Sequence, residues 1–139
     1  MEITIDSYLL TAPSIDIKID RNYGADYMHF IFRGHLSYDA CNKAIRAWST
    51  KFDRDNRQYK MIWDCQDMVS YDHKARNEWV TTLTRYGDRI DSIYVVSNSL
   101  WIRGTAILMN KLSRYNLRVF RSFEDLNADL RLHEKSEIA

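Results

Sequence analysis

The segment from residue 64 to residue 73 holds the densest set of side chains that could do chemistry. Asp64, Asp67 and Asp72 lie close together in the sequence, and His73 follows the last of them. Grouped carboxylates can ligate a hard cation. They can equally cap a following helix and accept hydrogen bonds from loop amides. We favour the second role, so the sequence predicts no metal site and no cofactor.

Cys65 beside Asp64 would make a nucleophile if His73 acted as its base. The sequence shows no third orienting group and no oxyanion-hole motif for such a pair. It also lacks glycine-rich phosphate loops, the GxSxG elbow and the HExxH metal motif. The histidines have no spacing typical of a metal site; they are His29, His35, His73 and His133. A hydrolytic enzyme is therefore our third-ranked interpretation.

Trp101 and Arg103 are further candidates, near the start of a predicted helix. An exposed Trp beside an Arg is typical of a protein interface, whereas a Trp at a helix start can equally belong to the core, and both alternatives stay open. We expect the chain to present this helix start and residues 70–76 to a partner. The predicted partner-binding residues are Ser70, Tyr71, Asp72, His73, Arg76, Trp101 and Arg103.

Two strands begin the fold that must position these side chains. Residues 14–20 alternate strictly between polar and apolar, which is typical of a strand with one buried face. Residues 27–32 are apolar on both faces except for His29, which suits an interior strand and makes this histidine a core or sheet-face residue. Gly24 can supply the turn that joins the two strands as a hairpin.

Helices and strands then alternate to the end of the chain. Apolar residues recur at helical spacing after Ser37 or Asp39 and again after Asp72, with a loop expected between Asp64 and Asp72. Gly87 should end the second helix. Later strands are predicted at residues 61–63, 93–96 and 117–120, with helices capped by residues 97–99 and 122. Such alternation implies right-handed crossovers and mainly parallel later strands. The predicted fold class is therefore α/β, a mixed sheet with helices packed on it through Trp48, Trp79, Leu83, Ile102 and Leu126.

Length and composition bound the class of protein. The 139 residues fit one domain, residues 1–139, with its core over about residues 15–130. Basic and acidic residues number 20 and 19, so no long-range attraction to nucleic acid is expected. No apolar run approaches the roughly 20 residues that a membrane span needs. Cys41 and Cys65 lack a CxxC arrangement, so we expect free thiols and a cytoplasmic protein.

Taken in order, several segments resemble the STAS domain family, which includes bacterial anti-sigma-factor antagonists and the cytoplasmic ends of sulfate transporters. Residues 32–36 (Phe-Arg-Gly-His-Leu) resemble that family's strand and Gly-x-Leu before its first helix, and residues 61–64 resemble its central strand ending in Asp. Asp72 stands where the antagonists carry the Asp before a phosphorylated serine. Residues 119–130 resemble the last strand and C-terminal helix.

The resemblance implies a STAS-like fold, in a divergent SpoIIAA-like branch, and a protein–protein interaction or regulatory role in the bacterial cytoplasm. His73 replaces the serine after Asp72, so we expect the usual serine phosphoswitch to be missing. Ser70 is the nearest substitute phosphate acceptor, and we interpret it as a plain loop residue. A small-ligand binder for lipid or nucleotide, resembling Sec14-type carriers, ranks second. The partner itself is not specified, and a homodimer is one of the options.

Overall fold

The protein is described by a computed structural model that covers residues 7–22, 25–55, 57–112 and 116–138. Within these residues the strands are β1 (Ser7–Thr11), β2 (Ile15–Asn22), β3 (Ala25–Leu36), β4 (Tyr59–Tyr71), β5 (Ile90–Val96) and β6 (Asn116–Phe120). The helices are α1 (Tyr38–Arg54), α2 (His73–Arg85), α3 (Leu100–Leu112) and α4 (Phe123–Ile138), with a short 3-10 turn, η1 (Gly87–Arg89).

The described strands form one sheet in the order β1-β2-β3-β4-β5-β6. β1 and β2 are antiparallel, as are β2 and β3, whereas β3, β4, β5 and β6 run parallel to one another. The predicted α/β class, the antiparallel pairing of the two hairpin strands and the parallel later strands are therefore confirmed, whereas the predicted turn at Gly24 lies outside the described residues. β1 was not predicted, because residues 7–11 show no alternation; its position depends on pairing with β2 at the edge of the sheet.

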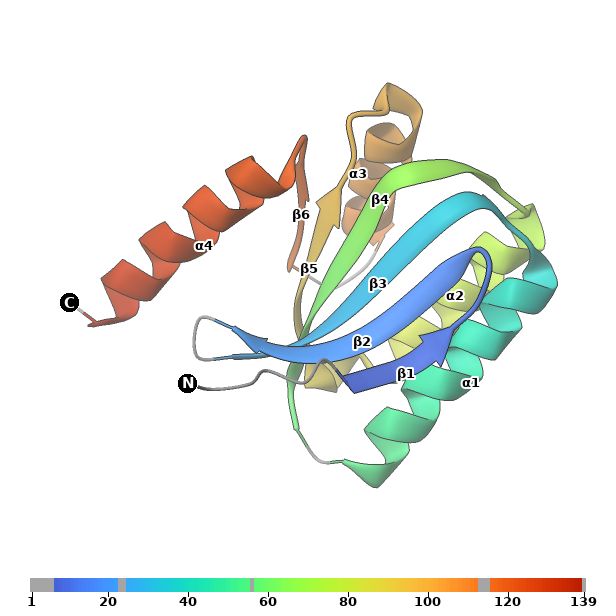
Figure 1. The fold of residues 1–139 in the computed structure, drawn as a ribbon, viewed down its shortest axis with the longest axis horizontal. Helices are drawn as coiled ribbons and strands as arrows, with labels where there is room; N and C mark the ends of the chain where they lie inside the picture. The colour runs from blue at the N-terminus through green and yellow to red at the C-terminus, as the bar shows by residue number, and fades with distance from the viewer. Residues whose placement is uncertain (1–6, 23–24, 56, 113–115, 139) are drawn as a thin grey trace.

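The strand order decides which face each helix covers. The parallel strands are added one after another in the same direction, and right-handed crossovers then place α1, α2 and α3 on the same face. Figure 1 shows α1 and α2 side by side on this face, with α4 apart from them. α4 packs on the opposite face, where Leu126 and Leu130 meet Tyr27, Ile62 and Tyr94.

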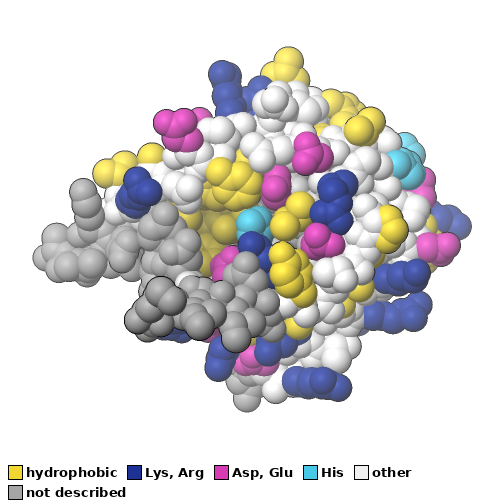
Figure 2. Space-filling view, viewed as in Figure 1, with side chains coloured by type: hydrophobic (Ala, Val, Ile, Leu, Met, Phe, Trp, Pro, Cys, Tyr) yellow, Lys and Arg dark blue, Asp and Glu magenta, His cyan; other side chains and the backbone are white. Residues whose placement is uncertain are grey.

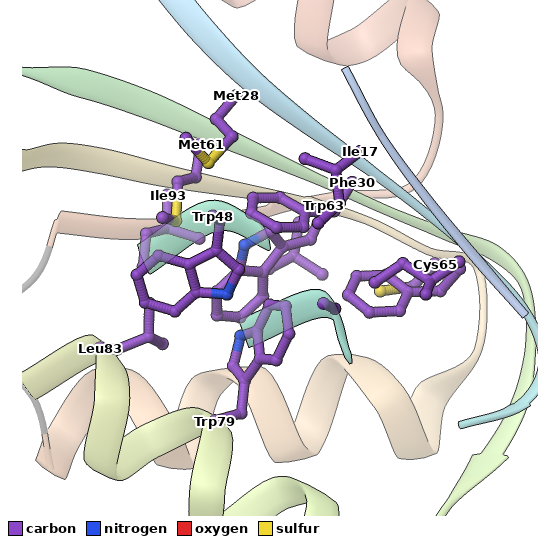
Figure 3. Close-up of a cluster of buried hydrophobic side chains, with 14 of the residues drawn as sticks. Ile17, Met28, Phe30, Trp48, Met61, Trp63, Cys65, Trp79, Leu83 and Ile93 are labelled. Atoms are coloured by element: carbon purple, nitrogen blue, oxygen red, sulfur yellow. The ribbon is translucent and has the colours of Figure 1, made fainter. Parts of the chain in front are cut away.

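The larger core lies between the sheet and the crossover helices (Figure 3). Ile15 and Ile17 of β2 are fully buried there, as the alternation predicted. The Trp79 ring of α2 packs edge-on against Phe30 and Trp48, with centroid distances of 5.4 and 5.9 Å. All the side chains predicted to hold the helices on the sheet are buried, namely Trp48, Trp79, Leu83, Ile102 and Leu126.

Two predicted boundaries are wrong. The segment expected as a loop after Asp64 continues as strand to Tyr71, because it pairs with an extension of β3 through residues 33–36. β3 passes Gly34 without ending: this glycine has a φ of 62°, in the left-handed region, and the register shifts on both sides of it. Gly34 therefore forms a bulge inside β3 and does not end the strand.

The helix starts follow the sequence closely. The Ser37 hydroxyl accepts a hydrogen bond from the amide of Ala40, and the Ser122 hydroxyl accepts one from the amide of Asp125, which confirms both residues as caps. Gly87 follows the C-cap residue of α2, as predicted, but it begins η1 instead of adopting a left-handed conformation.

Arg33 ties the turn between β1 and β2 to β3. Its guanidinium forms two hydrogen bonds with the Asp16 carboxylate, at 3.0 and 3.1 Å, and donates to the carbonyl oxygen of Ala12 at 2.8 Å. The hydrogen bonds from Arg33 lower the pKa of Asp16. A carboxylate with a lowered folded-state pKa stabilises the fold above its unfolded pKa, and this stabilisation is lost as the pH falls through the folded-state value.

We therefore expect Asp16→Asn to lower the free energy of unfolding by about 1 kcal/mol at neutral pH, since the pair is only partly buried. Urea denaturation at pH 7 and near pH 3 provides the measurement. The difference between wild type and D16N should shrink at the lower pH, because protons then compete with Arg33 for the wild-type carboxylate. Arg33→Met should cost a similar amount, and a D16N effect that is independent of pH would contradict the assignment.

Candidate functional site

The candidate site lies at the edge of the sheet where β4 and β5 end and α2 and α3 begin. Tyr71, the last residue of β4, stacks on Trp101 in the first turn of α3, with ring centroids 4.8 Å apart and ring planes 21° from parallel. The Tyr71 hydroxyl donates to Thr105 Oγ1 at 3.3 Å. Parallel strands place their carboxyl ends at one edge, so the two predicted partner-binding segments meet there. We call Tyr71 and Trp101 the aromatic pair.

Trp101 is half exposed, at 52%, which decides between the two alternatives left open by the sequence: it belongs to the surface and not to the core. Leu100 and Val69, each within two residues of the aromatic pair, are 79% and 74% exposed. His73 is also exposed. Leu100 and Val69 are therefore exposed apolar side chains next to the aromatic pair in the sequence, and His73 adds an exposed polar ring.

His35 connects the other predicted residues. Its Nδ1 lies 2.6 Å from Ser70 Oγ, and its Nε2 lies 2.9 Å from Asp72 Oδ1. The second Asp72 oxygen accepts a hydrogen bond from the amide of Tyr38 at 2.9 Å. The hydrogen bond from Tyr38 contributes most to lowering the pKa of Asp72, and the one with His35 contributes next. Sequence reasoning missed His35, because it placed the strand end before Gly34. The β3–β4 register pairs His35 directly with Ser70.

The order Ser70, His35 and Asp72 is the order of a serine nucleophile, its base and an orienting acid. Here the side chains of His35 and Asp72 are 49% and 44% exposed. Water therefore competes for both groups, and the orienting acid lacks the burial found in such triads. Asp72 is the N-cap residue of α2, as predicted, yet its side chain makes no cap hydrogen bond. The cluster fastens the start of α2 to β3 and to α1.

An apolar pocket of about 80 Å³ opens between α2, α3 and the sheet. Tyr71 forms part of its wall, so the pocket adjoins the aromatic pair. Arg76 is the charged residue on its rim, and Arg76 Nε is buried without a hydrogen-bond partner. The lining residues are Phe32, Leu36, Trp63, Cys65, Met68, Tyr71, Ala75, Arg76, Trp79, Val95, Ile102 and Thr105. Arg103 is half-buried and does not line this pocket.

The thiols do not form a nucleophilic site. Cys41 and Cys65 are both free, as expected from their spacing, and both are buried. Burial raises the pKa of each thiol to about 12, and Asp64 adds to the shift at Cys65. Burial also raises the pKa of Asp64. Within the described part of the chain, no three His, Cys, Asp or Glu side chains converge in a way that could hold a metal ion.

The opposite face of the sheet carries a second, polar pocket, of about 190 Å³. Lys18 and His29 lie directly across from each other in the β2–β3 register, and Asn127 faces them from α4. Figure 2 shows this face, with a histidine side chain recessed among apolar, acidic and basic side chains. His29 is therefore a sheet-face residue, one of the two places predicted for it. Asp20 Oδ2 lies 3.8 Å from His29 Nδ1.

Comparison with solved structures places this geometry in a known fold. A DUF3478-family protein from Shewanella loihica PV-4, described as having a SpoIIAA-like fold, matches with a TM-score of 0.71 at 12% sequence identity, over 94% of this chain and 98% of that one. The chain adopts the SpoIIAA-like fold. The anti-sigma factor antagonist SpoIIAA, in its unphosphorylated form, matches with a TM-score of 0.60 at 10% identity, over 83% of this chain and 97% of its own.

The SpoIIAA-like fold confirms the STAS-like architecture that the sequence resemblance implied. At these identities the likeness shows the fold alone. No family model matches the sequence, and no curated protein does. Among the described residues, no helix has both the length and the apolar character that crossing a membrane requires.

Proposed function

We propose that the chain is a non-enzymatic protein–protein interaction module of the STAS type, and that its partner docks on the aromatic pair. The observation that carries this proposal is the stacking of a half-exposed Trp101 on Tyr71, at the meeting point of two helix starts. Large amphipathic rings held rigid at a surface are the side chains that most often dominate binding energy. Val69 and Leu100, each within two positions of the pair in the sequence, are also exposed apolar side chains.

The proposed module works without a serine phosphoswitch. His73 occupies the position after Asp72, so no hydroxyl is available there. The Ser70 hydroxyl is held 2.6 Å from His35 Nδ1, which occupies it within the fold. We expect the protein to reside in the bacterial cytoplasm. Intact mass spectrometry of the protein purified from its native cell should show no stoichiometric phosphate. A phosphate on Ser70 would restore the switched mechanism.

Trp101→Ala and His73→Ala should each weaken partner binding by about 1–2 kcal/mol while leaving the fold intact. Pull-down of a stoichiometric protein from the native cell supplies the partner, and titration calorimetry gives the affinities. Arg131→Ala, exposed on α4 across the sheet, is the matched control and should bind as wild type does. Equal affinities for wild type and the Trp101 variant would move the interface elsewhere.

A small-ligand binder is the second candidate, and the apolar pocket is the observation that favours it. Pockets that hold small molecules usually measure roughly 300 Å³ or more, whereas this one measures about 80 Å³. The volume is too small for a nucleotide or a lipid chain, so we rank this function below the interaction module. Native mass spectrometry after gentle purification tests it directly: a co-purifying small molecule would reverse the ranking.

Nucleic acid is not a proposed partner, because the 20 basic and 19 acidic residues nearly cancel. A second copy of the chain is the remaining alternative to a different protein. Light scattering over a range of protein concentrations distinguishes a monomer from a dimer, and loss of dimer in the Trp101→Ala variant would make the partner a second copy.

A further inference from the structure

The apolar pocket and Arg76 together describe the chemistry of what docks beside the aromatic pair. We infer that the partner presents a protein segment with one branched aliphatic side chain, which enters the pocket, and a nearby carboxylate, which pairs with Arg76. This inference rests on the proposed interaction function.

The size and lining of the pocket select the apolar side chain. An apolar cavity of about 150 Å³ is large enough for a benzene ring, and this pocket measures about 80 Å³. It therefore suits a Val, Leu or Ile side chain better than an aromatic ring. Its walls are almost wholly apolar and include Trp63 and Trp79 from the core, so an inserted aliphatic group would be removed from water.

The inferred carboxylate on the partner is argued from the missing hydrogen-bond and ion-pair partners of Arg76. Arg76 lines the pocket, its Nε is buried without a hydrogen-bond acceptor, and it makes no ion pair with any described residue. Asp72, one helical turn earlier, is the acid that would ordinarily pair with it. Both Asp72 oxygens are engaged instead, one by His35 and the other by the amide of Tyr38.

The remaining charge at the start of α2 has the same sign. The first turn of α2 contains no acidic residue, and the Lys74 side chain is exposed there. Cations at a helix N-terminus are disfavoured by the helix dipole, so the arrangement is not explained by the stability of α2. An incoming carboxylate would accept hydrogen bonds from Arg76 and meet a second cation in Lys74, whereas an incoming Lys or Arg would face both like charges.

Selection of peptides from a random phage-displayed library on the full chain tests the inference. We expect enriched peptides to share one Val, Leu or Ile with an Asp or Glu within about four residues, a separation that one turn of chain can span. Binding of such a peptide should weaken about tenfold in Arg76→Gln. It should be unchanged in Arg131→Gln, which removes an exposed charge on the other side of the sheet.

A pocket-filling variant tests the apolar half separately. Thr105→Leu adds apolar volume to the pocket wall and should abolish peptide binding, with circular dichroism confirming the fold. Enriched peptides that lack an acidic residue, or an acidic preference that survives Arg76→Gln, would overturn the inference and leave the interaction module standing. Failure to enrich any peptide would also overturn it. The module itself is judged by capture of its partner with wild type and with Trp101→Ala.

Discussion

Trp79→Ala should lower the free energy of unfolding by about 3–5 kcal/mol, the range for removing a buried Trp and leaving a cavity. Trp79 is only 5% exposed. Its ring meets Phe30, Phe32, Trp48 and Trp63, with centroid distances of 5.4, 5.7, 5.9 and 6.0 Å. These contacts join α2 to α1 and to the middle of the sheet, so the neighbouring rings cannot close the gap without moving an element. Urea denaturation measures the loss.

Trp101→Ala is the matched control for this effect, since it deletes the same indole from a half-exposed position. It should cost less than about 1 kcal/mol. A loss below about 1 kcal/mol for Trp79→Ala would show that Trp79 is not part of the core. A comparable loss for both variants would show that Trp101 carries a structural role, and the case for an interface at the aromatic pair would fall.

The native protein should resist thiol reagents at pH 8, where the unfolded protein reacts at both cysteines. With the pKa of Cys41 and Cys65 raised to about 12, the thiolate fraction at pH 8 is lower by about 10³-fold than for an exposed cysteine. Burial also keeps reagents away from both sulfur atoms. Absorbance with a disulfide reagent, in buffer and in concentrated urea, gives the two rates.

Val69→Cys supplies the positive control for this measurement, because that position is 74% exposed at the end of β4. The variant should show one fast thiol in the native state beside the two protected ones. A fast native reaction in the wild-type protein would contradict the burial of both thiols. It would reopen the interpretation of Cys65 as a nucleophile with His73.

Most of the fold could be predicted from local patterns. Strict alternation in residues 14–20 and helical spacing after Ser37 and Asp72 reflect which side of each element is buried, and that information is carried by neighbouring residues. The order of strands and helices then implied parallel strands, because right-handed crossovers leave few other arrangements. The same patterns placed Trp48 and Trp79 in the core, where both are buried.

The ends of β3 and β4 could not be predicted in this way. Gly34 reads as a strand end, yet pairing with residues 67–71 of β4 keeps β3 extended through it. That pairing joins residues more than thirty positions apart, so no local window contains the signal. The structure thereby brought His35 to Ser70 and Asp72, a grouping absent from the sequence analysis.

The sequence by itself determined several residues of the candidate site: Ser70, Tyr71, Asp72, His73, Arg76 and Trp101 were named from their types and their places at predicted helix starts, whereas His35 was not. Only the tertiary structure decided how they are used. The register between β3 and β4 places His35 within hydrogen-bond distance of Asp72. Arg76 Nε is then buried without a hydrogen-bond partner. Contact between the end of β4 and the start of α3 stacked a half-exposed Trp101 on Tyr71, and a pocket opened between α2, α3 and the sheet. Residue types follow from the chain, whereas the partner of each polar group depends on contacts that form only when the sheet assembles.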